Sequence, residues 1–428
     1  GFDAQPVIDA VSDFFTNNRE YGNLPRKFKM TISGCKHDCG QSQINDVGLT
    51  PAKKEVGGVS ASDASGDSSE QSSDGEWQYG FHVKVGGGLS DGPRMASPLD
   101  VFVPPEDAVE FCRAVAQTFK ELGDRNNRGV CRMRYLVQQM GAEKFEEAVR
   151  DRTSIEFPTR GVDLTEGYTG DHVGVHDMKA DGLKYVGFNV VTGRMGGEEF
   201  AAAARAAEKY GTDDASIRLA TDQNFLVTHI PEENVEDLLA EDFAAEYQPD
   251  PGPFSRGAVG CTGNEFCNYA IIETKKRTKR WARELDERID TPDDLDVVRM
   301  HMSGCSASCA QPQIADIGFR GETVKVGEDG EELPDDADHE DFDDLVEGMD
   351  FGRGGALGTD NEFLDWVETA VPAHAVIPAL EHLLDAYAEE RTEGERFYEW
   401  SRRVDNDRLR SIMQQAEANV SGGVAHGD

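Results

Sequence analysis

One segment of the sequence occurs twice, and this repeat constrains the fold more than any other feature. Residues 32–49 align with residues 302–319 without a gap, and nine of the 18 positions are identical. Each copy is followed by a glycine-rich segment, a Val-Pro pair and a helix-like stretch, at residues 86–89, 103–104 and 106–122 and at residues 354–357, 371–372 and 373–388. Repeats this long are typical of a duplicated domain, whereas solenoid units span ~20–50 residues. We therefore predict two copies of one domain.

The offset between the copies, 302 − 32 = 270 residues, also makes a prediction about the start of the chain. Counterparts of Cys261 and Cys267 would stand at positions −9 and −3, before Gly1. The counterpart of residues 171–260 would also lie upstream. We therefore expect the sequence to be truncated at its N-terminus, with a further segment before Gly1 in the natural protein.

The remaining periodic segments mix helix and strand patterns. Periodicity predicts short strands over residues 185–191 and 217–220, and helices over residues 106–123, 142–152, 198–209, 234–239, 274–288 and 375–388. Two segments rich in acidic or small residues, 56–75 and 327–347, interrupt the repeats and are predicted to be solvated loops, the first within a β-hairpin. The end of the chain, 419–428, is expected to fray. The fold class that follows is α+β (mixed α/β).

The charge of the chain excludes some partners. Asp and Glu number 82 and Lys and Arg 43, which gives a net charge of −39. A field of this sign repels phosphate backbones, so we expect no nucleic acid partner. The excess is spread along the chain and suits a salt-loving cytoplasm, because the Debye length in molar salt is only ~3 Å. An ordinary acidic protein is the alternative. No apolar run approaches the ~18 residues of a membrane helix, and no signal peptide is visible, so we predict a cytoplasmic protein without a membrane partner.

Six of the eight cysteines fall in closely spaced pairs, Cys35/Cys39, Cys261/Cys267 and Cys305/Cys309, while Cys112 and Cys131 are isolated. Four thiolates from two loops can hold an iron–sulfur cluster or a zinc ion. The five-residue gap after Cys261 is long for a zinc knuckle, so the spacing favours the cluster. Zinc, and thiols without a metal or in disulfides, remain open.

The residues around these cysteines resemble a known family. Residues 261–267 (CTGNEFC), 270–275 (AIIETK) and 299–318 (RMHMSGCSASCAQPQIADIG) resemble the sirohaem and [4Fe–4S] signature of ferredoxin-dependent nitrite and sulfite reductases. Residues 23–29 (NLPRKFK) resemble the substrate loop of that family, and residues 172–176 (HVGVH) and 222–224 (DQN) follow in its order. The resemblance extends from Phe2 to about Glu389.

This resemblance implies a pseudo-two-fold duplicated fold. It implies a first-repeat domain without a cluster (1–155), a ferredoxin-like half domain (165–245), a domain that binds sirohaem and [4Fe–4S] (250–390) and a helical tail (391–428). It also implies that Cys261, Cys267, Cys305 and Cys309 bind the cluster, and that Cys309 is in addition the axial ligand of the sirohaem iron. Cys35 and Cys39 are then relics of the first repeat.

The resemblance further implies a reaction and its residues. Nitrite or sulfite is reduced by six electrons that ferredoxin delivers singly. Lys27 and Lys29 bind the anion and lend protons; we expect them on one strand, where a spacing of two places both side chains on one face. The alternative is that they are solvated surface lysines. Two further arginines of the family would lie before Gly1.

A cofactor with eight carboxylates needs basic and hydrogen-bonding residues around it. Candidates for sirohaem contacts are Arg194, Arg218, Gln223 and Asn224, each of which could equally be a structural polar residue. The helix-like segment 274–288 carries a cluster of basic residues, Lys275, Lys276, Arg277, Lys279, Arg280 and Arg283, which could dock an acidic ferredoxin or form a plain solvated face.

The choice between the two anions rests on opposing signals. The cysteine loops look more like those of nitrite reductases, whereas Lys29 stands where sulfite reductases have Lys and nitrite reductases usually have Asn. We therefore predict assimilatory nitrite reduction, with sulfite reduction as the alternative. Two other classes remain, a non-catalytic metal- or cluster-binding protein and a tetrapyrrole-biosynthesis enzyme. Residues 86–88 lack the context of a dinucleotide fingerprint, so electrons are expected from a separate protein.

Overall fold

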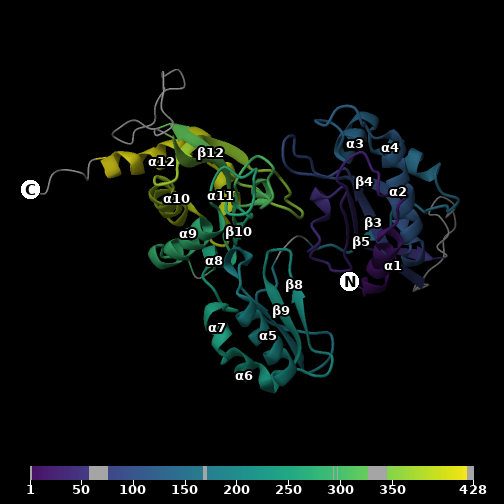
Figure 1. Cartoon of the computed structure of the whole chain (residues 1–428), viewed down its shortest axis with the longest axis horizontal. Coiled ribbons are helices and arrows are strands. Elements are labelled where there is room, and N and C mark those ends of the chain that lie inside the picture. The colour runs from purple at the N-terminus through teal and green to yellow at the C-terminus, as the bar shows by residue number, and fades with distance from the viewer. Residues whose placement is uncertain are drawn as a thin grey trace, which may run out of the picture. The chain divides into compact units, whose positions relative to one another are not determined.

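A computed structural model describes residues 2–56, 76–166, 171–292, 294–295, 297–325 and 345–421, without the side chains of residues 56 and 415–421. The chain divides into two compact units, shown in Figure 1. The first comprises Gly1–Gly170 and Leu357–Thr359, and the second Asp171–Ala356 and Asp360–Asp428. Each unit is described by itself.

The first unit is built on a mixed sheet with the order β1-β2-β3-β4, in which β5 also pairs with β2. Only β1 and β2 are parallel. Apolar residues from α1, α2 and α4 pack against the sheet and form the core with Val47, Phe81 and Val101. The elements are β1 (Met30–Ile32), β2 (Val47–Val56), β3 (Glu76–Val85), β4 (Ser97–Val103), β5 (Val162–Asp163), α1 (Gln5–Phe15), α2 (Ala108–Leu122), α3 (Met133–Met140) and α4 (Ala142–Arg150).

The second unit contains a related sheet, with the order β10-β11-β12-β13-β14. The strands are β10 (Ala258–Gly260), β11 (Met300–Ser303), β12 (Ile317–Lys325), β13 (Leu345–Arg353) and β14 (Asp365–Pro372). Its helices are α8 (Pro253–Arg256), α9 (Lys275–Arg288), α10 (Val376–Glu390), α11 (Phe397–Arg403) and α12 (Asn406–Ser421). Trp281, Phe319, Leu380 and Trp400 lie in one buried core that joins α9, α10 and α11 to the sheet.

Residues between the two repeats form a smaller layer of the second unit, a four-stranded antiparallel sheet with the order β6-β7-β9-β8. Phe188, Phe225 and Phe243 form an aromatic cluster between this sheet and its helices. The elements are β6 (Gly174–Asp177), β7 (Leu183–Phe188), β8 (Ser216–Leu219), β9 (Phe225–Pro231), α5 (Gly197–Tyr210), α6 (Val235–Leu239) and α7 (Asp242–Glu246).

The predicted duplication is confirmed down to the strand register. Met30 pairs with Val47 in the first unit, and Met300 pairs with Ile317 in the second, so both partners are shifted by 270 residues. The glycine-rich segments also match, since Gly87 donates to the Asn45 carbonyl and Gly355 to the Ala315 carbonyl, each at 2.9 Å. A Cβ atom on either glycine would lie 2.6–2.7 Å from backbone oxygens, so the close approach requires glycine in both copies.

Several local predictions need correction. The strand expected over 185–191 ends at Phe188, and a 3-10 turn follows at Val191–Gly193. Lys27 and Lys29 do not lie on a strand, because β1 begins only at Met30. The other expected strand and the helices occur with ends shifted by a few residues, which is the usual uncertainty of element boundaries. The predicted loops and tail are too long: Val56 belongs to β2, residues 345–347 belong to β13, and residues 419–421 belong to α12. Residues 57–75, 326–344 and 422–428 lie outside the described residues, and the antiparallel pair β2 and β3 flanks the first segment, as expected of a hairpin.

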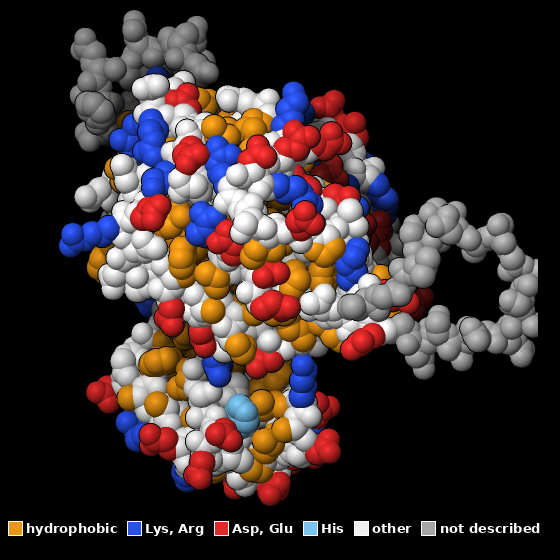
Figure 2. Space-filling view, turned by 90° about the vertical axis from the view of Figure 1, so that its right-hand side faces the viewer, with side chains coloured by type: hydrophobic (Ala, Val, Ile, Leu, Met, Phe, Trp, Pro, Cys, Tyr) orange, Lys and Arg blue, Asp and Glu red, His pale blue; other side chains and the backbone are white. Residues whose placement is uncertain are grey.

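We expect the folded state to need high salt. Acidic side chains are scattered over the face seen in Figure 2, and the net charge of −39 makes the folded chain repel itself at low ionic strength. Thermal unfolding followed by circular dichroism should therefore give a Tm that rises steeply between 0.1 M and 2 M salt. NaCl and KCl should act alike if screening is the cause, and a Tm that does not change would contradict this explanation.

No helix among the described residues is long and apolar enough to cross a membrane.

Candidate functional site

The four cysteines of the second repeat lie in loops that begin at adjacent strand ends. β10 and β11 are parallel neighbours with Gly260 opposite Met302, so Cys261 and Cys305 follow the same edge of the sheet. The Cys261 amide donates to the Met302 carbonyl at 3.1 Å. The sulfur of Cys261 accepts hydrogen bonds from the backbone amides of Gly304, at 3.2 Å, and Gly263, at 3.4 Å. Amide donors of this kind stabilise a thiolate.

The loop that carries Cys267 folds back onto the loop that carries Cys305. The Cys267 amide donates to the Gly263 carbonyl at 3.0 Å, and the Ile271 amide donates to the Gly304 carbonyl at 2.7 Å. Gly263 has a φ of +70°, and a Cβ atom there would lie 2.6 Å from Thr274 Oγ1. Glycine is therefore required where the chain turns between Cys261 and Cys267.

Cys305 and Cys309 stand in a tight turn. The Ser308 amide donates to the Cys305 carbonyl at 3.4 Å, and the Gln311 amide donates to the Ser308 carbonyl at 3.0 Å. Ser308 and Gln311 both have left-handed backbone angles, with φ of +58° and +61°. This turn carries both cysteines, and the preceding Gly304 amide joins it to the Cys261 sulfur.

The four cysteines are the donor set that an iron–sulfur cluster requires, although their sulfur atoms do not surround a single point. All eight cysteines lie in the described residues and none forms a disulfide. Among the described residues, no group of three or more His, Cys, Asp or Glu side chains is placed to hold a single metal ion. Four thiols on two touching loops, with amide hydrogen bonds on one sulfur, are nevertheless the chemistry of a cluster site. The assignment of these four ligands stays a prediction.

Two residues that sequence reasoning proposed for sirohaem lie beside the cysteine loops. The amide of Gln223 bonds the backbone of Gly260 in both directions: Nε2 donates to the carbonyl at 3.0 Å and Oε1 accepts from the amide at 3.3 Å. Arg194 forms an ion pair with Glu265 at 2.7 Å, and its guanidinium lies over the ring of Phe266. Gln223 therefore fixes the strand that leads to Cys261, and Arg194 contacts the loop that leads to Cys267.

The other two sirohaem candidates are placed differently. Asn224 is buried, and its Oδ1 accepts from the Val190 amide at 2.7 Å, which is a structural role within the four-stranded sheet. Arg218 is exposed on β8. The structure thus does not bring Asn224 or Arg218 to the cysteine loops, and all four sirohaem contacts stay predictions.

Sequence reasoning missed Lys275 as a residue of this site. Its Nζ donates to the Gly260 carbonyl at 3.1 Å and to the Thr192 carbonyl. Burial lowers the pKa of Lys275, and nearby Arg194 lowers it further, whereas the Cys261 sulfur opposes the shift. A half-buried cation therefore lies next to one ligand sulfur. Its position within the AIIETK motif was the available signal.

The basic face of α9 is largely neutralised. Lys279 and Arg283 both pair with Glu246 of α7, at 2.9 and 2.8 Å. These basic residues and Arg288 line an open groove of about 580 Å³, but Arg288 is itself paired with Glu381 at 2.7 Å. Because the acidic partners come from distant segments, the sequence could not show this pairing. Docking of ferredoxin on α9 stays a prediction, and the pairing weakens it.

In the first unit, Lys27 and Lys29 flank Phe28, a partly buried residue that packs against the core. The ring of Phe28 stacks on Phe119 of the core at 5.6 Å between centroids. Lys27 is exposed and Lys29 is half-buried. Since side chains alternate along an extended backbone, anchoring Phe28 in the core leaves both lysines on the opposite side. Their shared face is thus expected even without a regular strand.

A buried carboxylate fixes Lys29. The Lys29 amide donates to Asp46 Oδ2 at 2.9 Å, and Arg132 donates to the same oxygen at 3.0 Å. Burial raises the pKa of Asp46, and Arg132 opposes that shift. Its counterpart Asp316 likewise accepts from the Arg299 amide, at 2.8 Å. Sequence reasoning missed Asp46 and Arg132, although Asp46 is one of the nine identical positions of the repeat.

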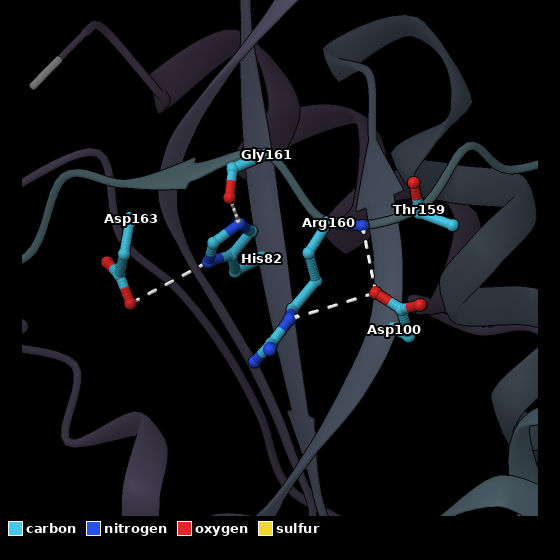
Figure 3. A pocket seen from close by; sticks show the side chains of 6 residues that line it. All are labelled: His82, Asp100, Thr159, Arg160, Gly161 and Asp163. Carbon is cyan, nitrogen blue, oxygen red and sulfur yellow. Dashed lines mark hydrogen bonds and ion pairs between the residues drawn. The ribbon is translucent and has the colours of Figure 1, made fainter. Parts of the chain in front are cut away.

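A surface cavity of the first unit contains none of the predicted site residues. Figure 3 shows His82, which lies 3.6 Å from Asp163 and contacts the Gly161 carbonyl at 3.1 Å. Arg160 lies 3.8 Å from Asp100 on the other side of the cavity. These contacts satisfy one another and join β5 to the sheet, so we assign the cavity no role.

Comparison with known proteins agrees with this architecture. A family model described as "Nitrite and sulphite reductase 4Fe-4S domain" matches residues 1–157 and 252–420. A second, described as "Nitrite/Sulfite reductase ferredoxin-like half domain", matches residues 176–241.

Two curated relatives and one solved structure are similar over most of the chain. The assimilatory ferredoxin-dependent nitrite reductase of Haloferax mediterranei is 36% identical over 99% of this chain and 69% of the relative. The ferredoxin–nitrite reductase of Synechococcus elongatus is 35% identical over 90% of this chain and 68% of the relative. The structure of the Mycobacterium tuberculosis NirA protein superposes with a TM-score of 0.80 at 29% identity, over 95% of this chain and 68% of that one. The chain thus spans about two thirds of the length of each.

Proposed function

Because the chain belongs to the nitrite and sulphite reductase family, we propose that it provides most of a ferredoxin-dependent enzyme that reduces nitrite to ammonia for assimilation. The observation that carries this proposal is the placement of Cys261 and Cys305 at neighbouring ends of parallel strands, with their loops hydrogen-bonded to each other. Two relatives named as nitrite reductases support the choice of nitrite.

Cys261, Cys267, Cys305 and Cys309 would hold a [4Fe–4S] cluster, and Cys309 would also ligate the iron of sirohaem. Bound together, these groups would relay the six electrons that ferredoxin delivers one at a time. The described residues contribute the rest of the site. Lys275 places a cation beside the Cys261 sulfur, and Gln223 holds the strand before it. Lys27 and Lys29 bind the anion and hold protons that its oxygens need as they leave as water.

We propose nitrite over sulfite, and Lys29 offers a direct test of the pocket. Replacing Lys29 with Asn removes one positive charge while the Asp46 hydrogen bond, which uses the backbone amide, is kept. Sulfite carries more negative charge than nitrite, so the variant should lose more with sulfite. We expect the ratio of kcat/KM for nitrite over sulfite to rise about tenfold, the size of one charged hydrogen bond. An unchanged ratio would show that Lys29 does not contact the anion.

The electron donor and the compartment follow from the same family. Ferredoxin is the donor that we propose, since two relatives carry it in their names. We further propose a cytoplasmic enzyme of a salt-loving organism. The absence of disulfides among the eight cysteines suits a reducing compartment, and the net charge of −39 suits high salt.

The complete natural protein should be purified without oxygen and mixed with reduced ferredoxin and either anion. We expect ammonium from nitrite, iron and acid-labile sulfide in the protein, and a tetrapyrrole spectrum. Binding of zinc alone, with no ammonium or sulfide formed, would overturn the proposal and favour a non-catalytic metal protein. A cluster without bound sirohaem would favour a tetrapyrrole-biosynthesis enzyme.

A further inference from the structure

We propose that Cys35 and Cys39 of the first unit form a thiol–disulfide exchange site that reacts with the disulfides of small thiols. The proposed reductase function uses neither residue. Their sulfur atoms lie 3.8 Å apart, and the Cys39 thiol donates a hydrogen bond to the Cys35 sulfur. Both side chains are half-buried, so small reagents can reach them.

The loop that carries this pair is the first-repeat copy of the turn at Cys305 and Cys309. The Asp38 amide donates to the Cys35 carbonyl at 3.3 Å, and Asp38 and Gln41 have φ of +48° and +54°. This turn places the two thiols of the first repeat 3.8 Å apart on one loop.

The surroundings of the two turns differ in the number of thiols. In the second unit the Cys261 loop adds two thiols to the pair. In the first unit the remaining cysteines are engaged elsewhere: Cys112 is buried in the core, and the Cys131 thiol donates to the Arg128 carbonyl at 3.1 Å. No third His, Cys, Asp or Glu among the described residues is placed to complete a metal site with Cys35 and Cys39. Two thiols 3.8 Å apart are close enough for redox exchange.

The two thiols are chemically unequal. The Cys35 sulfur accepts hydrogen bonds from Cys39 and from the His37 amide, the latter at 3.5 Å. The ammonium of the next residue, Lys36, is paired with Glu166 at 2.6 Å. Cys39 has its pKa raised, first by its hydrogen bond to Cys35 and second by burial, and the buried carboxylate of Asp38 adds to this shift. Cys35 is therefore the attacking thiolate and Cys39 the resolving thiol.

A buried base lies within the same loop. His37 Nδ1 is buried and has no hydrogen-bond partner among the described residues.

The reaction balances with a small disulfide as the oxidant. The Cys35 thiolate attacks one sulfur of that disulfide, which forms a mixed disulfide and releases one small thiolate. Cys39 then loses its proton and attacks the Cys35 sulfur, which forms the Cys35–Cys39 disulfide and releases the second small thiolate. Two electrons pass from the protein to the reagent. The two sulfurs must approach from 3.8 Å to the ~2.05 Å of a disulfide bond.

Zinc is the competing occupant. Two sulfurs 3.8 Å apart also match the edge of a tetrahedron with ~2.3 Å bonds to zinc, but structural zinc requires four ligands.

The test uses the complete protein, oxidised glutathione without oxygen, alkylation and peptide mass mapping. We expect a Cys35–Cys39 disulfide in the unsubstituted protein and a glutathione adduct on Cys35 in Cys39→Ser. In Cys35→Ser, Cys39 should react at least about tenfold more slowly, because burial and the Asp38 carboxylate still raise its pKa after the Cys35 thiol is lost. Cys131→Ser, whose hydroxyl can keep the bond to Arg128, should form the disulfide at the unsubstituted rate.

One further variant and three contradicting results distinguish the exchange site from a zinc site and from the proposed reductase function. A Cys305→Ser, Cys309→Ser double variant should still form the Cys35–Cys39 disulfide, which shows that the result does not depend on the cluster ligands or on the proposed reductase function. Equal reaction of Cys35 and Cys39, no Cys35–Cys39 disulfide, or one zinc per chain that is lost in Cys35→Ser would each overturn the exchange site.

Discussion

Replacing Cys305 with Ser in the complete enzyme should reduce both bound iron and ammonium formation to background. A serine hydroxyl is a poor ligand for iron, and the loop that carries Cys305 also supplies the Gly304 amide that bonds the Cys261 sulfur. Loss of one ligand should therefore leave the remaining thiols without a cluster. The measurements are iron and acid-labile sulfide per chain, together with ammonium formed from nitrite by reduced ferredoxin.

The matched control for this variant is Cys131→Ser. Cys131 is also a cysteine that forms no disulfide, and its thiol already acts as a hydrogen-bond donor, to the Arg128 carbonyl. The control should keep full iron and activity. If Cys305→Ser keeps its iron, or if both variants lose iron alike, the four-cysteine ligand set is wrong.

Replacing Lys27 with Met should lower kcat/KM for nitrite about 10²–10³-fold, the usual effect of removing one preorganised donor to a reacting anion. Lys27 is exposed, while the neighbouring Phe28 is held in the core by Phe119. The substitution therefore removes charge without disturbing the packing, and the Tm should not change. Lys27→Arg should keep part of the activity, because it keeps the positive charge and the donors.

The control here is Lys144→Met, on the exposed side of α4 in the same unit. It changes the net charge equally but lies outside the proposed site, so its kcat/KM should stay within about twofold of the unsubstituted value. An equal loss in both lysine variants would indicate that a general change in the field of the protein, and not contact with the anion, is responsible.

The duplicated fold could be predicted from the sequence because the repeat preserves the spacing between residues that pair in neighbouring strands. The spacing between Met30 and Val47 recurs between Met300 and Ile317, and in both units these residues pair in parallel strands. The positions of the cysteine loops follow from the same strands, so local sequence was enough to predict them. Membership of the family and the duplicated fold are both confirmed by the comparisons.

The parts that sequence reasoning missed depend on contacts between distant residues. Gln223 uses its amide on the Gly260 backbone, 37 residues away, and Glu246 neutralises two basic residues of α9. Asp46 reaches Arg132 across 86 positions. No local pattern carries such pairings, because they arise only when the chain folds. The prediction that Lys27 and Lys29 lie on a strand was wrong. The polar–apolar–polar alternation of residues 27–29 resembles a strand pattern, but β1 begins only at Met30.

The paired hydrogen bonds between Gln223 and Gly260 have a consequence for biogenesis. The loop that holds Gln223 belongs to the small four-stranded layer, whereas Gly260 directly precedes Cys261, the first of the four proposed cluster ligands. Iron delivery to a nascent chain would thus find ordered ligands only after that layer has folded. Substitutions that destabilise the layer, far from any metal, should accordingly yield protein that accumulates in a folded but iron-poor form.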